Sequence, residues 1–565
     1  MSELIAKMKS QKILETAKIS PSFISPLFLV PKSDGTMRPI FNLKALNEFV
    51  LVDQFHLINM YRIPTFLQAK DWLCKIDLSQ AYFHLAISQG HRRFLRLIYE
   101  HELLEMTCLP FGLSTAPKTF SILTNWIAQI LREKNVRIVA YLDDYLIAHQ
   151  SARVLQEHVT LTISTLQYLG WQINFEKSVL TPQKSVTYLG IVWDPWDNRK
   201  VLPENKCVTI VKKVSEVLEQ KSVTIKDLQR VAGLLSFASF AVPRGRLNHR
   251  RLVMFLNSLP QNLTNNLYVM PQPVREELSW WVLNCHLPTP LHYPPPTHFL
   301  TTDASDLAWG AQLNNHALSG VWSKAEQTLH CNQKEMLAIL HALQSHAHLM
   351  RHSCILMQCD NKTAVSYLRK EGGTRSVPLL EITYQILHLL DWYRIDFSIH
   401  HIPGKFNNHA DHLSRHRRPP EWHLLPSCTE IVFKKFGLPM IDLFASEAAH
   451  VVFNYVTLDL RDREAVFHDA FSVPWNYPLA WIFPPPFLIP KVLAHLNQSL
   501  GTFLIVVPRW HRVFWRADLK ARSLAAPFTL RNLQSYLIDT STGLPPPNVA
   551  EMTLEVWKCG GGLNK

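Results

Sequence analysis

Two adjacent aspartates, Asp143 and Asp144, stand in the middle of an apolar run, RIVAYLDDYLIAH, at residues 137–149. The valine, isoleucine, leucine and tyrosine residues around them predict a β-hairpin with the acids at its turn. Neighbouring carboxylates repel each other, and burial penalises the charged form of both. A folded chain tolerates such a pair when a cation lies between them. The alternative is an aspartate-rich turn that caps two strands, and the rest of the chain must decide between the two.

A third carboxylate precedes the pair. In DWLCKIDLSQAYFHLAIS, residues 71–88, an apolar strand ends at Asp77. Three carboxylates on neighbouring strands can hold two divalent cations, the number that nucleotide polymerisation requires. Between the acids lies LPFGLSTAPKTF, residues 109–120, where Gly112 permits a close backbone approach and Pro117 precedes a helical run. This stretch predicts a loop that feeds a helix beneath a substrate.

Composition favours a polyanionic partner. The chain has 565 residues, a formal net charge of +13 and a pI near 9.2, which suits a multidomain protein that binds nucleic acid. The basic runs HRRFLRL (91–97) and RGRLNHRR (244–251) are candidate backbone contacts, or else solvated faces. The first 20 residues are charged and amphipathic, and no apolar run reaches transmembrane length. We therefore expect no membrane partner and an intracellular location, in the cytoplasm, the nucleus or both.

A second set of acids follows the proline-rich stretch LPTPLHYPPP. HFLTTDASD carries Asp303 at the polar end of a predicted strand, and NQKEMLAILHALQSH is a predicted helix with Glu335 in its first turn. CILMQCD ends a strand at Asp360, and IDFSIHHIPGKFNNHADHLSR predicts a strand, a loop and a helix bearing Asp411. These acids could converge on one metal site. Each could also be an ordinary acid favoured at a helix N-terminus.

The motifs and their order resemble those of retrotransposon reverse transcriptase–RNase H polyproteins. FLVPKSDGTMRPIFNLKALN (28–47) resembles the fingers segment, KIDLSQAYF the palm motif with the first aspartate, and LPFGLSTAP the template-and-nucleotide loop. YLDD resembles the signature hairpin, while NFEKS (174–178) and TYLG (187–190) resemble the next two palm motifs.

The resemblance implies a role for each matching residue of the polymerase. Asp77, Asp143 and Asp144 would bind the metals, with help from the Leu78 carbonyl. Tyr82 would stack under the sugar and exclude a 2′-hydroxyl, and Gly112 would lie in the nucleotide loop. Lys32 and Arg38 would clasp the triphosphate, and Lys177 would give a proton to pyrophosphate or be a solvated surface lysine.

The second set resembles an RNase H domain. Asp303, Glu335, Asp360 and Asp411 match its metal-binding acids in order, and His401 matches a mobile histidine that helps product or protons leave. The resemblance implies two Mg²⁺ or Mn²⁺ ions in each active site. It implies an RNA template, RNA–DNA hybrid, DNA and dNTPs as partners. The hybrid would be gripped through its shape and phosphates.

The last block, residues 418–565, shows alternating strands and helices. It resembles the methyltransferase-like region of DIRS-type, tyrosine-recombinase retroelements. In FPPPF (483–487) Pro484 occupies the position where an amino methyltransferase holds its target amine with a polar side chain. We therefore expect a packed accessory domain without methyl transfer. A recombinase and a capsid protein of the same element would be encoded separately.

These observations predict a multidomain protein of α+β and α/β class. The expected parts are right-hand polymerase fingers and palm (1–200), a helical thumb or connection (201–286), a linker (287–297), an RNase H-like domain with a mixed five-stranded sheet (298–417) and a C-terminal α/β domain (418–565). The expected function is RNA- and DNA-directed DNA polymerisation with RNase H activity in retrotransposon replication, by two-metal-ion phosphoryl transfer. One alternative is a non-catalytic, domesticated nucleic-acid-binding remnant. Another, an RNA-synthesising polymerase, is opposed by Tyr82.

Overall fold

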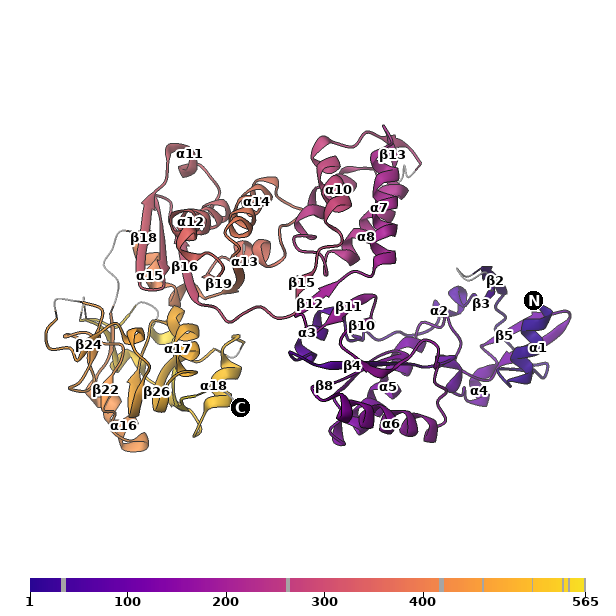
Figure 1. The fold of residues 1–565 in the computed structure, drawn as a ribbon, viewed down its shortest axis with the longest axis horizontal. Coiled ribbons are helices and arrows are strands. Elements are labelled where there is room, and N and C mark those ends of the chain that lie inside the picture. Colours follow the sequence, from indigo (N-terminus) through magenta and orange to yellow (C-terminus); the bar gives the residue numbers. More distant parts are fainter. Residues whose placement is uncertain are drawn as a thin grey trace. The chain divides into compact units, whose positions relative to one another are not determined.

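The structure is a computed structural model that describes residues 1–31, 37–260, 265–415, 421–459, 462–510, 512–540, 543–546 and 549–562. The chain packs into two units (Figure 1). The first comprises Met1–Gly245 and Gln261–His292, and the second comprises Arg246–Pro260 and Tyr293–Lys565.

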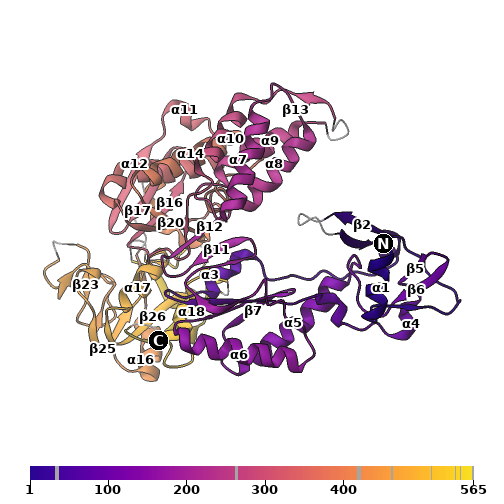
Figure 2. The same cartoon turned by 45° about the vertical axis from the view of Figure 1, so that its right-hand side comes forward.

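The first unit is built around a four-stranded sheet. Its order is β7 (Ile138–Tyr141), β8 (Asp144–His149), β4 (Trp72–Asp77) and β9 (Val179–Gln183), with antiparallel neighbours throughout. Two helices, α5 (Ala116–Glu133) and α6 (Ala152–Tyr168), lie along one side of the sheet (Figure 2). Their apolar faces bury Phe120 and Leu155 against Tyr145 and Ile147 of β8. The hairpin predicted around the paired aspartates is therefore confirmed.

Shorter elements flank this sheet. The N-terminal part contains β2 (Leu27–Pro31) paired with β3 (Met37–Phe41), a sheet of β1 (Leu14–Thr16), β6 (Glu102–Met106) and β5 (Arg96–Tyr99), and helices α1 (Ser2–Ser10), α2 (Lys44–Asn47), α3 (Ile63–Phe66) and α4 (Gln89–Arg92). A separate apolar core holds this part together, with Leu14, Leu43 and Leu104 almost completely buried.

The rest of the first unit is largely helical. It contains α7 (Glu204–Leu218), α8 (Ile225–Ala238) and α10 (Gln272–Asn284), a sheet of β10 (Val186–Tyr188), β11 (Ile191–Asp194), β12 (Arg199–Val201) and β15 (Thr289–Pro290), and the pair β13 (Val223–Thr224) and β14 (Leu267–Tyr268).

One helix of the expected thumb segment, α9 (Arg250–Ser258), packs in the second unit instead. Leu247 lies in the apolar core of that unit and Met254 packs against it. The Arg251 guanidinium forms an ion pair of 2.7 Å with Glu381, and the Tyr384 hydroxyl donates to the Leu247 carbonyl at 3.2 Å. The segment 201–286 is thus divided between two cores, because the apolar face of α9 is covered by helices that lie far along the chain.

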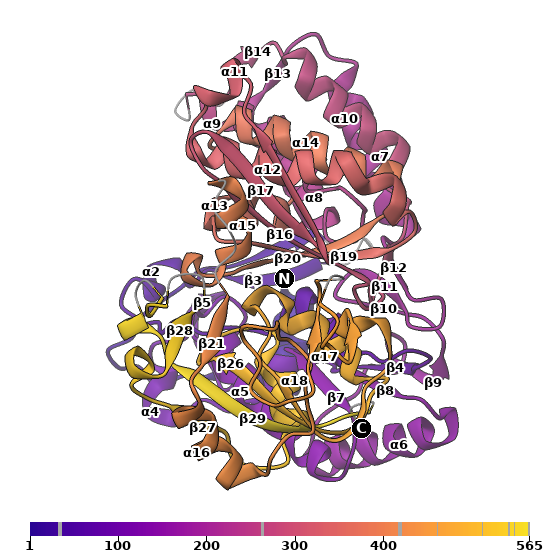
Figure 3. The same cartoon turned by 90° about the vertical axis from the view of Figure 1, so that its left-hand side faces the viewer.

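The second unit contains a mixed five-stranded sheet, as expected (Figure 3). Its order is β18 (His316–Val321), β17 (Ala308–Leu313), β16 (His298–Ala304), β19 (Cys354–Cys359) and β20 (Asp396–His401). Strands β16, β19 and β20 are parallel, and the two remaining pairs are antiparallel. The helices are α11 (Lys324–Gln327), α12 (Cys331–His346), α13 (Lys362–Arg369), α14 (Val377–Trp392) and α15 (Asn408–Ser414).

The C-terminal part is a second layered α/β domain, which confirms the alternating pattern seen in the sequence. Its sheet has the order β22 (Ile441–Asp442), β25 (Asn476–Ile482), β26 (Leu500–Pro508), β29 (Leu554–Gly560) and β27 (Phe528–Leu530). Strands β22, β25 and β26 are parallel, whereas β29 is antiparallel to both of its neighbours. The remaining elements are α16 (Pro426–Phe436), α17 (Ile489–Leu496), α18 (Arg516–Arg522) and the pairs β21 (Trp422–Leu424) with β28 (Leu537–Asp539) and β23 (Val456–Thr457) with β24 (Phe467–His468).

Within the described part of the chain, none of the helices combines the length and the apolar character needed to cross a bilayer.

Candidate active sites

The structure brings Asp77, Asp143 and Asp144, the first acidic cluster, to one end of the first sheet. Asp77 is the last residue of β4 and lies directly opposite Asp144, the first residue of β8, in the antiparallel ladder. The Leu78 amide donates to the Asp143 carbonyl at 3.0 Å, which ties the two chain segments together. Leu142, in the two-residue turn between β7 and β8, has a φ of +52°, a left-handed conformation that side-chain-bearing residues rarely adopt. Such strain is characteristic of functional sites.

The carboxylates of this cluster disfavour each other's charge. Burial raises the pKa of Asp144 to about 6, with Asp143 and Asp77 adding to the rise and the Lys75 ammonium, 3.4 Å away, opposing it. Burial likewise raises the pKa of Asp143, and Asp77 adds to that effect. A divalent cation would remove this repulsion, because carboxylate oxygens are ligands that Mg²⁺ and Mn²⁺ favour.

Two hydroxyl groups that the sequence analysis did not single out position the cluster. The Asp77 amide donates to Ser178 Oγ at 3.0 Å, and that hydroxyl donates to the Asn174 carbonyl at 2.6 Å. The Tyr188 hydroxyl donates to the Asp144 carbonyl at 3.1 Å. Ser178 and Tyr188 belong to NFEKS and TYLG, so the two later motifs support the two sides of the site.

The predicted nucleotide loop lies beside Tyr82. This ring is 8% exposed and packs against Phe111 and Phe120, with centroid separations of 4.7 and 5.0 Å. Gly112 has a φ of +101°, and a Cβ there would lie 2.8 Å from the Phe41 carbonyl, so the position requires glycine. Asn47 holds the loop: its side-chain amide donates to the Gly112 carbonyl and accepts from the Ser114 amide, both at 2.9 Å.

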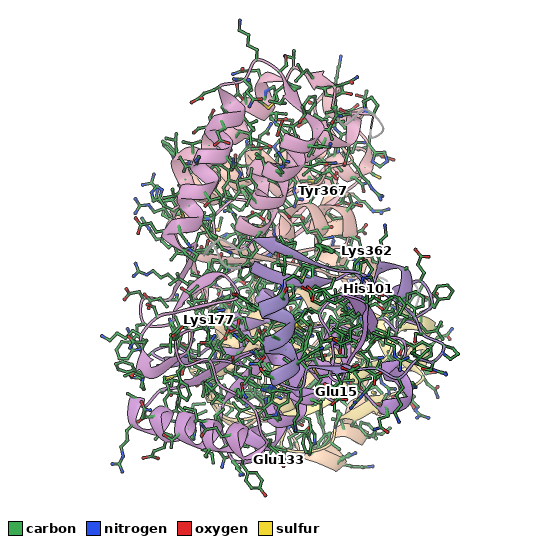
Figure 4. All side chains as sticks on the ribbon, turned by 90° about the vertical axis from the view of Figure 1, so that its right-hand side faces the viewer. Glu15, His101, Glu133, Lys177, Lys362 and Tyr367 are labelled. Carbon is green, nitrogen blue, oxygen red and sulfur yellow. The ribbon has the colours of Figure 1, made fainter. Side chains whose placement is uncertain are left out.

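Of the three basic residues predicted to contact the triphosphate, the structure describes the side chain of Lys177 alone. Lys32 lies outside the described residues. Arg38 pairs with Val30 in the β2–β3 ladder, and its side chain is not among those described. Lys177 is exposed on the turn before β9 (Figure 4), and its charge lowers the pKa of Asp143, which places it near the cluster.

The second acidic cluster lies where the central strands of the second sheet end. Its members are Asp303, Glu335, Asp360 and Asp411. Asp303 lies on β16, Glu335 on α12, Asp360 directly after β19 and Asp411 on α15. The candidate ligand atoms of Glu335, Cys359 and Asp360 lie within 4.8 Å of one another. Cys359 is fully buried, burial raises the pKa of its thiol far above the ordinary range, and the thiol donates to Glu335 at 3.7 Å.

Burial is deeper here than in the first cluster. It raises the pKa of Asp303 to about 7 and that of Glu335 to about 9, with neighbouring acids adding to both shifts. Asp360 also has a raised pKa, mainly because of burial and then of Asp411. A cluster of such carboxylates suits hard divalent cations, and the residues present therefore fit the expected metals.

Helix α15 is held against the sheet by residues missed in the sequence. The Ser414 hydroxyl donates to Asp303 at 2.6 Å, and the buried Asn407 amide donates to the Thr302 carbonyl at 2.9 Å. Gly310 lies opposite Asp303 in the β16–β17 ladder, where a Cβ would lie only 2.4 Å from two backbone atoms of α15. Only glycine allows α15 to approach this closely, and glycine in a strand is the signal that could have revealed the contact.

His401, the last residue of β20, has a pKa lowered mainly by burial and then by Lys362, which Figure 4 labels on α13. A neutral imidazole near the acids is able to accept a proton. Arg415 forms an ion pair of 2.7 Å with Asp411.

The two basic runs serve mainly as internal contacts. Arg96 is 6% exposed and pairs with Glu105 at 2.7 Å, while Arg92 pairs with Glu15 at 3.0 Å. Arg250 donates to the Glu371 carbonyl at 3.2 Å, and Arg251 pairs with Glu381. These four arginines are engaged within the protein, and contact of the two runs with a nucleic-acid backbone stays a prediction.

The second unit also contains a cavity of about 530 Å³. It opens where β22 and β25 end, and its lining includes Phe444, Phe471 and the prolines of FPPPF. Pro484 offers no hydrogen-bonding side chain there.

Comparison with known families identifies two parts of the chain. Residues 30–193 match the family described as reverse transcriptase (RNA-dependent DNA polymerase). Residues 294–379 match the RNase H-like domain found in reverse transcriptase. The protein carries a reverse transcriptase domain and an RNase H-like domain. The first match contains the whole first acidic cluster, whereas the second ends before His401 and Asp411.

Relatives share most of this two-domain region. The enzymatic polyprotein of Cauliflower mosaic virus is 25% identical over 72% of this chain and 60% of its own length. The Transposon Tf2-3 polyprotein of Schizosaccharomyces pombe is 26% identical over 73% of this chain and 30% of its own length. The chain therefore spans less than two thirds of these relatives, and it is homologous to viral and retrotransposon polyproteins. A foamy viral protease–reverse transcriptase, solved in complex with double-stranded DNA, aligns with 71% of this chain and 69% of its own, at 19% identity and a TM-score of 0.47.

Proposed function

We propose that the protein is an RNA- and DNA-directed DNA polymerase with RNase H activity, acting in retrotransposon replication. The observation that carries the polymerase assignment is the placement of Asp77 opposite Asp144, with Asp143 in the strained turn between strands. A turn that merely caps two strands would be solvated and would need no third carboxylate. Here Asp77 lies in register with Asp144, and burial raises the pKa of both Asp143 and Asp144. This favours the metal-site reading of YLDD.

Asp77, Asp143 and Asp144, with the Leu78 carbonyl, would hold two Mg²⁺ or Mn²⁺ ions. When bound, these ions supply Lewis-acid activation of the primer hydroxyl and stabilisation of the leaving pyrophosphate. The protein's own groups orient the reactants. Tyr82 would form the floor under the sugar, and its packed ring leaves little room for a 2′-hydroxyl. Lys32, Arg38 and Lys177 would contact the triphosphate, with Lys177 as the proton donor to the leaving group.

The second acidic cluster would hydrolyse the RNA strand of RNA–DNA hybrids. Asp303, Glu335, Asp360 and Asp411 would hold the divalent ions, whose positive charge would offset the repulsion from neighbouring acids that adds to the raised pKa of Glu335. The neutral ring of His401 would accept a proton as product leaves. The partners of the whole protein would be an RNA template, hybrid, DNA and dNTPs, in the cytoplasm or nucleus.

The C-terminal domain fits the DIRS-type assignment that the sequence suggests. A parallel β22–β25–β26 core with a cavity at the strand ends is compatible with a methyltransferase-like fold. Pro484 in FPPPF has no polar side chain that could hold an amine, which argues that the domain does not transfer methyl groups to amines. A separately encoded recombinase and capsid protein would complete the element.

Two variants of the full chain test both activities together. Parent protein should extend a DNA primer on an RNA template with Mg²⁺ and dNTPs, and should cleave the RNA of a labelled hybrid. Asp143→Asn should abolish extension and keep cleavage, whereas Asp360→Asn should abolish cleavage and keep extension. Each variant thus controls for folding of the other. If the parent binds hybrid but shows neither activity, the non-catalytic binding remnant is the better description.

A further inference from the structure

The side of the RNase H-like sheet that faces away from its helical core is covered in part by α15 and in part by the C-terminal domain. The register places Thr301, Gln358 and His400 side by side on neighbouring strands, so their side chains share this face. The Gln358 amide donates to the Phe487 carbonyl at 3.1 Å in a buried contact. His400 stacks on Phe514 with ring centroids 3.8 Å apart.

The connecting segment, residues 402–407, joins β20 to α15 and also packs against the C-terminal domain. Ile402 and Phe406 are 1% and 2% exposed, and they form one apolar cluster with Phe487 and Leu488. Trp510 stands edge-on to Phe406 at a centroid separation of 4.3 Å. Helix α17 follows Phe487 and Leu488, and in Figure 1 it lies below β16. The connecting segment therefore owes its burial to the C-terminal domain.

Polar contacts reinforce this packing on both sides. The Lys405 ammonium donates to the Glu551 carbonyl at 3.1 Å. The Asn315 amide, in the β17–β18 turn, donates to Asp469 at 2.6 Å. Asp469 has a φ of +60°, a conformation that a non-glycine residue holds only when its surroundings demand it.

The connecting segment lies between two residues of the proposed RNase H site. His401 directly precedes it, and Asp411 follows four residues into the next helix. Within it, Asn407 bonds the carbonyl of Thr302, the residue before Asp303. A Cβ at Gly404 would lie 3.0 Å from an Asp360 carboxylate oxygen, so the backbone of the segment touches the site directly.

We propose that the C-terminal domain positions the RNase H site, by holding the connecting segment through Phe487 and Trp510. The inference rests on the RNase H activity proposed above. Phe487 and Trp510 are positioning residues that touch neither substrate nor reacting atoms. A domain without methyl transfer thereby has a function in the element: it fixes the distance between Asp411 and the acids of the sheet.

The test replaces Trp510 in the full chain. Trp510→Ala should speed hydrogen exchange across residues 402–411 and lower kcat for hybrid cleavage roughly tenfold, because small misplacements of catalytic groups are costly. KM for the hybrid should stay close to that of the parent, since the surfaces that grip phosphates are unchanged. Trp510→Phe retains an aromatic ring against Phe406 and should restore kcat.

Phe433→Ala is the matched control. Phe433 packs on Trp481 at 5.5 Å in a different apolar cluster of the same domain, so its loss removes a ring without touching the connecting segment. Primer extension reports on the first unit in every variant. Parent-like exchange in Trp510→Ala, or an equal loss of cleavage in Phe433→Ala, would overturn the proposal. If the parent cleaves no hybrid, the proposed activity fails, whereas the exchange measurement still decides whether Trp510 holds the segment.

Discussion

A substitution at Gly310 tests whether the second acidic cluster depends on the close approach of α15 to the sheet. The space that a side chain at this position would occupy is already filled by the backbone of α15. A Cβ at this position would lie 2.4 Å from both the Ala410 carbonyl oxygen and the Ser414 amide nitrogen. Neither atom can rotate away as a side chain would. Ordinary contact begins near 3.4 Å, so Gly310→Ala should push α15 back by about 1 Å.

That shift acts on the chemistry through two residues of α15. Asp411 is one of the proposed metal ligands, and Ser414 donates its hydroxyl to Asp303. A displacement of about 1 Å in a catalytic group typically costs about 100-fold in rate. We therefore expect Gly310→Ala to cleave RNA–DNA hybrid about 100-fold more slowly than the parent, with primer extension unchanged.

The assay compares steady-state hybrid cleavage and primer extension on the same preparations. Gly233→Ala, in helix α8, is the control, since a Cβ there meets nothing within 4 Å. A Gly310→Ala protein that extends primers and cleaves hybrid at the parental rate would show that α15 can move without consequence. The close approach of α15 would then have no part in the site.

Three further predictions concern other positions. Tyr82→Ala should raise incorporation of rNTPs relative to dNTPs, whereas Tyr82→Phe should not; unchanged sugar selection in the alanine variant would refute the assignment of that ring. Asn47→Ala removes two hydrogen bonds from the Gly112 loop, each worth about 1 kcal/mol, and should raise KM for dNTPs in primer extension while hybrid cleavage stays constant. Burial raises the pKa of Asp442 from 3.8 to about 7, so the folded C-terminal domain binds this proton more tightly than the unfolded chain. The stability that this proton contributes to the folded domain is fully present below pH 3.8 and falls by roughly 4 kcal/mol as the pH rises to about 7. Asp442→Asn should flatten this pH dependence, measured as the stability of β25 and β26 to hydrogen exchange. An unchanged pH profile in the variant would contradict the prediction.

Most of the acids were predictable in position, because they lie near the end of an apolar strand or in the first turn of a helix. Glu335 is the exception: α12 begins at Cys331, so Glu335 lies just after the first turn in which it was predicted. Asp77 ends β4, Asp360 follows β19, and Asp411 lies on the short helix after β20, as local patterns indicated. An apolar strand pattern shows at which residue the strand ends, and the ends of neighbouring strands lie close together in a sheet. These strand and helix patterns are local and depend on no distant contacts.

The supporting residues were not predictable in the same way. Ser178 reaches the Asp77 amide from 101 positions away, and Ser414 reaches Asp303 from 111 positions away. Serines in a loop or a short helix carry no periodic signal that points to a partner. Pairings of this kind depend on tertiary packing, and a single sequence reveals them only when a motif happens to include the residue.

The division of the chain shows why domain limits drawn from composition were incomplete. Proline-rich residues 287–297 looked like the boundary between the two catalytic parts, yet Arg246–Pro260 belongs with the second unit. Arg251 and Leu247 contribute an ion pair and a core side chain to α14 and its neighbours, so a fragment that begins after the prolines would expose part of the RNase H-like core. The second unit thus takes supports from both directions along the chain, α9 from before and the C-terminal domain from after. Each acidic cluster nevertheless lies wholly within one unit, and this separation is the physical reason that a substitution in one site should leave the activity of the other intact.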